Sequence, residues 1–322
     1  MERTDIPTLP MADMMGGEAA CQALVKAAQD DPRIWALTAD VEKSVGLSDY
    51  AKALPERYLN VGIAEQTMVG IAAGLATCGK VPFAVTFAFL ASMRACEQVR
   101  SNVCYPNLNV KIYATHAGMS IATGGTTHHA TEDLAIMRSF ANMTVLVPAD
   151  IHQIAKVIPA SVAHEGPVYI RLRRGLMPLV YGEKDDYQIG RANRLREGSD
   201  VALMGCGITV SQCLIAAEML SRDGVDAQVW DMHTLKPIDA AAVEKAGSET
   251  RRIVTVEDHN IIGGLGSAVA EVMAERCIAV PLARLGVRDE FVAIGPEADL
   301  MARNNTTGPE IAARVLEILD EH

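Results

Sequence analysis

Short apolar runs alternate with longer segments of helical periodicity over the first half of the chain. The apolar runs have the length and the β-branched content of buried strands. They cover Ile34–Thr38, Val81–Thr86, Val110–Thr115, Thr144–Val147 and Pro167–Arg171. Helical patterns lie between them, over Glu18–Gln29, Tyr58–Gly79, Leu90–Val103, Glu132–Ser139 and Ile151–Ala163. This alternation predicts a mostly parallel sheet covered by helices on both faces.

The alternation stops over residues 179–198, where Pro, Gly and mixed charges follow no long period, and it then restarts. The predicted strands of the second half are Val201–Met204, Ala227–Trp230, Arg252–Val256 and Ala279–Ala283, with helices over Ile208–Leu220, from Asp239 and after Gly266. We therefore expect an α/β fold of two consecutive domains with mostly parallel sheets. The domains cover residues 1–178 and 199–322, and residues 179–198 form a linker.

The segment Tyr58–Gly79 stands out because an acidic residue sits in an otherwise apolar helix. Asn60 is the expected N-cap and Gly79 follows the helix end. From Met68 onward the side chains are apolar or small, which leaves no face for water and predicts a buried helix. Glu65 is then either partly solvated near the positive end of the helix dipole, or held in an apolar pocket where it exchanges a proton with a ligand.

Composition narrows the class of protein. The 322 residues are 49% hydrophobic and 21% charged, with a net charge of −11 and no run of basic residues, which argues against nucleic acid or an anionic membrane as a partner. No apolar run of about 18 residues indicates a membrane span. Seven scattered cysteines without C-x-x-C spacing, and no export signal, favour free thiols in a cytoplasmic protein.

Polar and aromatic residues follow the predicted strands of the first domain. Asp40 comes after the first strand, Phe87 after the second and His116 after the third, and His128 and His129 lie on the next loop. Parallel sheets place ligands at these strand ends. Each residue alone also has a purely structural interpretation, as a turn cap, a core ring or a buried histidine, so their shared position carries the prediction.

Three sequence motifs are similar to those of the transketolase family. VGIAEQ followed by an Ala/Gly-rich helix resembles the helix that activates the cofactor, and TFAFLASMRACEQVR and GTTHHATEDLAIMR continue the resemblance. It implies that residues 1–178 form the pyrimidine-binding domain of a thiamine diphosphate enzyme and residues 199–322 a transketolase C-terminal domain.

The same resemblance assigns cofactor-binding residues. Glu65 would hydrogen-bond the pyrimidine ring of thiamine diphosphate and drive removal of the proton from the thiazolium C2 atom. Phe87 would stack on the pyrimidine, and Asp40 would lie near the cofactor. A second family aromatic matches Leu90, with Phe89 displaced by one position, so which of the two lines the pocket stays open.

Substrate residues are implied in the same way. His128 matches a catalytic histidine that contacts the substrate carbonyl or hydroxyls. His116, Ser44 and Arg174 match the residues around the sugar phosphate, a group that a bidentate Arg suits, although Arg171 and Arg173 are close enough to compete.

Two departures from the family concern substrate choice. Gly124 and Thr126 replace the Asp and Pro of the D-G-P-T-H loop, which reads sugar stereochemistry, and Asp13 or a neighbour replaces an Arg of the phosphate site. The substrate is therefore expected to be a sugar or sugar phosphate, of altered stereochemistry or with a branched chain, or a sugar with another acid group.

The segment G-D-G…N, which binds Mg²⁺ and the diphosphate in full-length transketolases, does not occur. The chain is thus expected to be the C-terminal subunit of a split transketolase, active with an N-terminal subunit that holds Mg²⁺, in a 2+2 heterotetramer, and to contain no metal site of its own. The alternatives are a 2-oxoacid dehydrogenase beta subunit, a deoxyxylulose phosphate synthase-like enzyme and a non-catalytic structural subunit.

Overall fold

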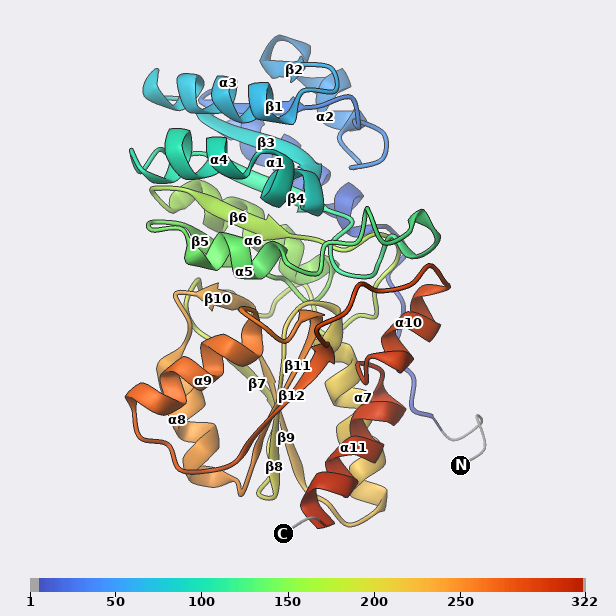
Figure 1. Ribbon diagram of the computed structural model, residues 1–322. Helices are drawn as coiled ribbons and strands as arrows, with labels where there is room; N and C mark the ends of the chain where they lie inside the picture. The colour runs from blue at the N-terminus through green and yellow to red at the C-terminus, as the bar shows by residue number, and fades with distance from the viewer. Residues whose placement is uncertain (1–5, 321–322) are drawn as a thin grey trace.

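A computed structural model describes residues 6–320, which fold into two α/β units, each built on its own sheet (Figure 1). Residues 1–5 and 321–322, which the predicted domains include, lie outside the described residues. Both sheets are mostly parallel and flanked by helices, so the predicted fold class is confirmed.

The first sheet has seven strands in the order β10-β5-β6-β4-β3-β1-β2, all parallel except β10, which pairs antiparallel with β5. The strands are β1 (Ile34–Thr38), β2 (Tyr58–Asn60), β3 (Val81–Phe87), β4 (Lys111–Thr115), β5 (Thr144–Leu146), β6 (Val168–Arg171) and β10 (Thr234–Lys236). Because β10 comes from the second half of the chain, the second unit completes an edge of the first sheet.

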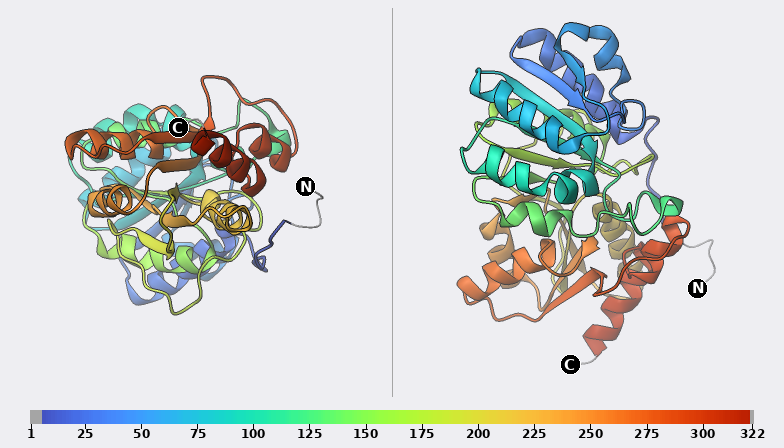
Figure 2. Two further views of the ribbon diagram at one scale, coloured as in Figure 1. Left: turned by 90° about the horizontal axis from the view of Figure 1, so that it is seen from below. Right: turned by 45° about the horizontal axis from the view of Figure 1, so that its top comes forward.

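Helices cover both faces of this sheet. One face carries α1 (Gly16–Asp30), α2 (Ser48–Ala53) and α6 (Ile151–Ala163), which share one hydrophobic cluster. The other face carries α3 (Glu65–Thr77), α4 (Cys96–Gln98) and α5 (Asp133–Ser139), and Figure 2 (right) shows α3 and α4 side by side in front of the sheet. Short 3-10 helices occupy Pro55–Arg57 and Ala122–Gly124.

The second sheet has five strands in the order β12-β11-β8-β9-β7. They are β7 (Asn193–Arg196), β8 (Val201–Gly205), β9 (Ala227–Asp231), β11 (Ile253–Asn260) and β12 (Leu282–Val287). The accompanying helices are α7 (Ile208–Arg222), α8 (Ala240–Glu249), α9 (Leu265–Glu275), α10 (Glu297–Arg303) and α11 (Gly308–Asp320). Strand β7 lies inside the predicted linker and pairs antiparallel with β9.

The predicted helix over Tyr58–Gly79 is wrong in its first turns. Residues 58–60 form β2, and the helix begins only at Glu65. Asn60 therefore does not cap the helix; its side-chain oxygen accepts from the backbone N–H groups of Asp40 and Gly62, at 3.1 and 3.0 Å. Gly62, with φ at 74°, turns the chain between strand and helix, where positive φ favours glycine.

Two other predictions need correction. The segment Leu90–Val103 is no regular α-helix, because π-helical turns at Leu90–Arg94 and Val99–Cys104 flank the single turn of α4. The strand predicted over Ala279–Ala283 runs instead from Leu282 to Val287.

Helix α3 is also less enclosed than predicted. Gln66, Thr67, Gly74 and Thr77 are exposed on one side, while Met68, Val69, Ala72 and Ala73 pack into the core. Across residues 6–320, no helix combines the length and the apolar character needed to cross a bilayer.

Candidate cofactor and substrate site

Three neighbouring strands bring predicted site residues to one edge of the first sheet. Strands β1, β3 and β4 run parallel, so Asp40, Phe87 and His116 emerge at the same end. The rings of Phe87 and His116 lie 4.1 Å apart between centroids. Asp40 and His116 both have positive φ, 61° and 58°, which turns the chain sharply as it leaves each strand.

Glu65 begins α3 and its side chain is 2% exposed. Both carboxylate oxygens accept hydrogen bonds from Arg94 Nη1, at 3.1 and 3.0 Å. The sequence left the burial of Glu65 open and did not predict this partner. The Arg94 side chain is half exposed, so the buried Glu65 carboxylate is paired with a guanidinium that also contacts solvent.

An aromatic row leads from Phe87 to the second histidine. The ring of Phe89 lies 6.5 Å from that of Phe87 and 4.8 Å from that of His128. Leu90, the other candidate, is 6% exposed. His128 itself is exposed, with Thr127 Oγ1 3.0 Å from its Nδ1.

Ser44, His116 and Arg174 line one cavity of about 20 Å³, together with Arg173 and the N-terminal turn of α1. Burial, with a smaller contribution from the nearby Arg174 charge, lowers the pKa of His116 to about 4, so the imidazole is neutral at pH 7. Thr115 Oγ1 lies 2.8 Å from its Nδ1.

The three arginines after β6 have different surroundings. Arg171 is 5% exposed and donates from Nε to Asp133, at 2.8 Å. Arg173 pairs with Glu297. Arg174 is exposed and lines the cavity, which leaves it the best placed of the three to meet an anion.

His129, next to His128, turns inward. It is 4% exposed, and its Nε2 lies 3.3 Å from the main-chain oxygen of Ala122. Burial lowers the pKa of this imidazole. His129 therefore stabilises the loop that presents its neighbour.

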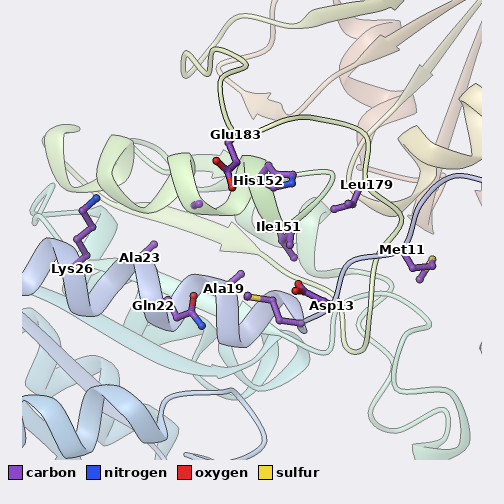
Figure 3. A pocket seen from close by; sticks show the side chains of 12 residues that line it. Met11, Asp13, Ala19, Gln22, Ala23, Lys26, Ile151, His152, Leu179 and Glu183 are labelled. Atoms are coloured by element: carbon purple, nitrogen blue, oxygen red, sulfur yellow. The ribbon is translucent and has the colours of Figure 1, made fainter.

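A larger cavity, of about 700 Å³, lies between α1 and α6 (Figure 3). Asp13 lines it, beside apolar residues such as Met11 and Ile151. Asp13, which the family pattern would place at the sugar phosphate, thus lies away from Ser44, His116 and Arg174, which line the smaller cavity.

Arg94 is the partner of Glu65 that the sequence did not predict. It lies in the quoted segment TFAFLASMRACEQVR, and the need of a buried carboxylate for a partner could have pointed to it. Phe89 was predicted only as an alternative to Leu90, and it directly precedes the π-helical turn that begins at Leu90.

Within residues 6–320, no group of three or more His, Cys, Asp or Glu residues is arranged to hold a metal ion. The polar residues of the site thus include a carboxylate with its guanidinium, two histidines and a second guanidinium.

A buried helix-start carboxylate, aromatic rings and histidines thus lie at the strand ends of the first unit of a two-unit α/β fold. Two family models cover most of the chain: "Transketolase, pyrimidine binding domain" matches residues 13–180 and "Transketolase, C-terminal domain" matches residues 190–311. The chain belongs to the transketolase family, among its split C-terminal subunits.

The chain is similar to named split subunits over nearly its whole length. It is 42% identical over 297 residues to the 6-deoxy-6-sulfo-D-fructose transketolase subunit SqwH of Clostridium sp. (strain MSTE9), covering 92% of each chain. It is 39% identical to an apulose-4-phosphate transketolase subunit of Phocaeicola vulgatus, covering 92% of this chain and 95% of that one.

A solved structure described as a split gene transketolase, inactive beta4 tetramer, has a TM-score of 0.88 and 44% identity, covering 94% of this chain and 98% of that chain. These relatives imply a transferase, and the pyrimidine binding domain family implies dependence on thiamine diphosphate.

Proposed function

We propose that this chain is the C-terminal subunit of a thiamine diphosphate-dependent transketolase that moves a two-carbon ketol unit from a ketose to an aldose. Residues 1–178 are its pyrimidine-binding domain, 179–198 its linker and 199–322 its C-terminal domain. The observation that carries the proposal is the burial of the Glu65 carboxylate at the start of α3, beside the strand ends that carry Phe87 and His116.

The residues present fit the pyrimidine half of thiamine diphosphate. Glu65 offers a buried carboxylate, Phe87 a partly exposed aromatic face, and Asp40 an exposed carboxylate at the end of β1. A Cβ added at Gly62 or Gly70 would meet nothing within 4 Å, so the backbone around Glu65 is open to a ligand or a second subunit. When bound, the cofactor supplies the electron sink for breaking a carbon–carbon bond.

Each of these side chains is proposed to contact or orient a different part of the cofactor. The Glu65 carboxylate would hydrogen-bond the pyrimidine ring nitrogen and exchange a proton with it, while the Arg94 guanidinium donates to both carboxylate oxygens and fixes their position. Phe87 orients the ring by stacking. We assign the second aromatic contact to Phe89, because its ring lies near the rings of both Phe87 and His128. Leu90, the residue that matches the family position, is buried.

The acid end of the ketose is proposed to bind at the mouth of the small cavity lined by Ser44, His116 and Arg174, where the exposed Arg174 side chain meets solvent. Neutral His116 and the Ser44 hydroxyl donate or accept hydrogen bonds there, and Arg174 supplies the positive charge. The named relatives act on a sulfo sugar and a sugar phosphate, which both carry an anionic group. His128 contacts the ketose carbonyl or hydroxyls from the opposite side of the aromatic row.

The open side of α3 supports a second polypeptide at the cofactor. Thr67 and Gly74 are exposed on this side, and Glu65 lies directly at its N-terminal end. We propose that an N-terminal subunit holding Mg²⁺ packs here, in a 2+2 heterotetramer in the cytoplasm.

Reconstitution tests the proposal. The chain is mixed with the N-terminal subunit, and calorimetry measures binding of thiamine diphosphate with Mg²⁺, followed by assays with a ketose phosphate and an aldose. Ketol transfer that requires both subunits is the expected result. Turnover of a 2-oxoacid with an artificial electron acceptor, without ketol transfer, would establish the dehydrogenase alternative, and failure to bind the cofactor would leave a structural subunit.

The variant His128→Ala tests the substrate side of the site. The Michaelis constant for the ketose is expected to rise about tenfold, the effect of losing a hydrogen bond of about 1.4 kcal/mol, while cofactor affinity stays unchanged. Steady-state kinetics with a varied ketose concentration provide the measurement. Unchanged kinetics would remove His128 from the site.

A further inference from the structure

Residues 117–131, here called the histidine loop, connect β4 to α5 and carry His128. The loop begins directly after His116, and it closes on itself where Gly118 pairs with Ala130. In Figure 1 the loop, in green, projects toward the red segment that precedes α10. Both ends and the tip of the loop touch the C-terminal half of the chain, which supplies none of the predicted site residues.

Hydrogen bonds from the C-terminal half reach the loop at separate points. The Met119 N–H donates to Asp258 Oδ1 at 3.0 Å. The Asn260 N–H donates to the Thr131 carbonyl at 2.8 Å, and Thr126 Oγ1 donates to the Val292 carbonyl at 2.7 Å. These contacts join the loop to the end of β11 and to the segment before α10.

Asp258 is the most constrained of these anchors. Its side chain is 2% exposed, and its own main-chain oxygen accepts from Arg171 at 2.8 Å. Gly118, with φ at 58°, packs so closely that an added Cβ would lie 1.9 Å from Asp258 Oδ2. Burial raises the pKa of this carboxyl to about 7, against the opposing charge of Arg171.

Apolar packing holds the same part of the loop. The Met119 side chain is fully buried in a cluster with Ile208, Val287, Val292 and Leu300, all from the C-terminal half. Met119 is therefore held by the C-terminal half both at its N–H and at its side chain, in addition to its chain connection to β4.

We propose that Asp258 is a positioning residue: by accepting the Met119 N–H and packing on Gly118, it sets the histidine loop where His128 meets the ketose. The C-terminal half thereby determines substrate affinity without touching substrate. This inference rests on the proposed transketolase function for its kinetic consequence, but the anchoring itself belongs to this chain alone.

Hydrogen exchange on the full chain tests the anchoring without any activity. Asp258→Ala is expected to speed exchange of the loop amides, Met119 above all, about tenfold, because the buried Met119 N–H loses its acceptor. Asp258→Asn keeps an acceptor oxygen and is expected to restore most of the protection. Thr126→Val, which loses only the bond to Val292, is expected to loosen the tip in the same direction and by less.

A matched control separates positioning from loss of stability. Asp239 also accepts backbone N–H groups, those of Ala192 and Ala242, at 2.8 and 3.0 Å, but it caps α8, away from the loop (Figure 1). Asp239→Ala is expected to lower the melting temperature without changing exchange in the loop.

Kinetics of the reconstituted enzyme give the second readout. Asp258→Ala is expected to lower kcat/KM for the ketose about 10- to 100-fold, mainly through KM, with unchanged affinity for thiamine diphosphate, while Asp258→Asn and Asp239→Ala stay near the wild type. Unchanged loop exchange in Asp258→Ala, or faster exchange with unchanged KM, would overturn the proposal. If the wild-type complex transfers no ketol unit, the proposed function fails, and the exchange experiment still decides whether Asp258 anchors the loop.

Discussion

At the scale of single residues, the site pairs a buried carboxylate with a partly exposed guanidinium. Glu65 is almost fully buried, yet both its oxygens are held by Arg94, which is half exposed. By contrast, the buried His116 imidazole is uncharged at pH 7, because burial lowers its pKa. An acid kept in place by a guanidinium and a histidine kept neutral are complementary settings for proton exchange and for hydrogen bonding to substrate.

The variant Glu65→Gln is expected to reduce turnover of the reconstituted enzyme at least about 100-fold, because an amide cannot exchange the proton at the pyrimidine ring. The fold is expected to persist, since the amide oxygen still accepts from Arg94. Activity assays and circular dichroism measure the two effects. Glu165→Gln, the same change on an exposed carboxylate beyond α6, serves as the control. Near-normal turnover in Glu65→Gln would contradict the proposed role.

His116 is expected to titrate near pH 4 rather than near 6.5, because burial disfavours the imidazolium. Its NMR signals should stay constant from pH 8 to about 5.5 and shift only below. Since the unfolded state takes up the proton first, the contribution of this residue to stability is full above about pH 6.5 and is lost as the pH falls toward 4. A midpoint near 6.5 would mean that the ring is solvated.

At the scale of elements, one tyrosine ties two site segments to the sheet. Tyr113, fully buried in β4, has its hydroxyl 2.8 Å from the carbonyl oxygens of Gly17 and Val45. Gly17 lies in the first turn of α1, and Val45 follows Ser44 on the segment after β1. The position of the Ser44 hydroxyl therefore depends on a side chain from the middle of the sheet.

Tyr113→Phe is expected to lower the free energy of unfolding by about 1–2 kcal/mol, because buried carbonyl groups lose their donor. It is also expected to weaken binding of the ketose acid group by displacing Ser44. Urea unfolding and steady-state kinetics measure these effects. Tyr105→Phe, at a residue 87% exposed, should change neither, and equal effects in the two variants would argue against the tie.

At the scale of the whole molecule, the exposed side of α3 is the surface on which the split architecture depends. An added Cβ at Gly74 would meet nothing within 4 Å, so the described chain itself leaves room there. A family member of known structure, described as an inactive beta4 tetramer, shows that a split subunit can assemble with its own kind.

Gly74→Trp is expected to prevent assembly with the N-terminal subunit while leaving the fold of the chain intact, because an indole would fill a flat contact surface. Light scattering of the mixed subunits gives the mass of the complex. Ser248→Trp, on the exposed side of α8, should assemble normally. Assembly of Gly74→Trp at wild-type strength would place the partner elsewhere.

The sequence by itself determined the layers of the fold, because hydrophobic periodicity records which faces are buried. The helix predicted over Ile151–Ala163 and the strand over Ile34–Thr38 agree with the structure residue for residue. The strand pattern also placed His116 directly after its strand, whereas Glu65 begins its helix instead of lying several residues inside it. These features depend on neighbours close in the chain, which a linear pattern can record.

Only the tertiary structure decided the partners of those residues. Arg94 reaches Glu65 across 29 positions, and Asp258 reaches Met119 across 139. The sequence does contain a signal for the Asp258 contact, because Glu257, Asp258 and His259 interrupt an apolar strand. It does not indicate which groups these side chains bind. Hydrogen bonds and ion pairs between distant segments follow from how sheets and helices pack, and no periodicity along the chain encodes that packing.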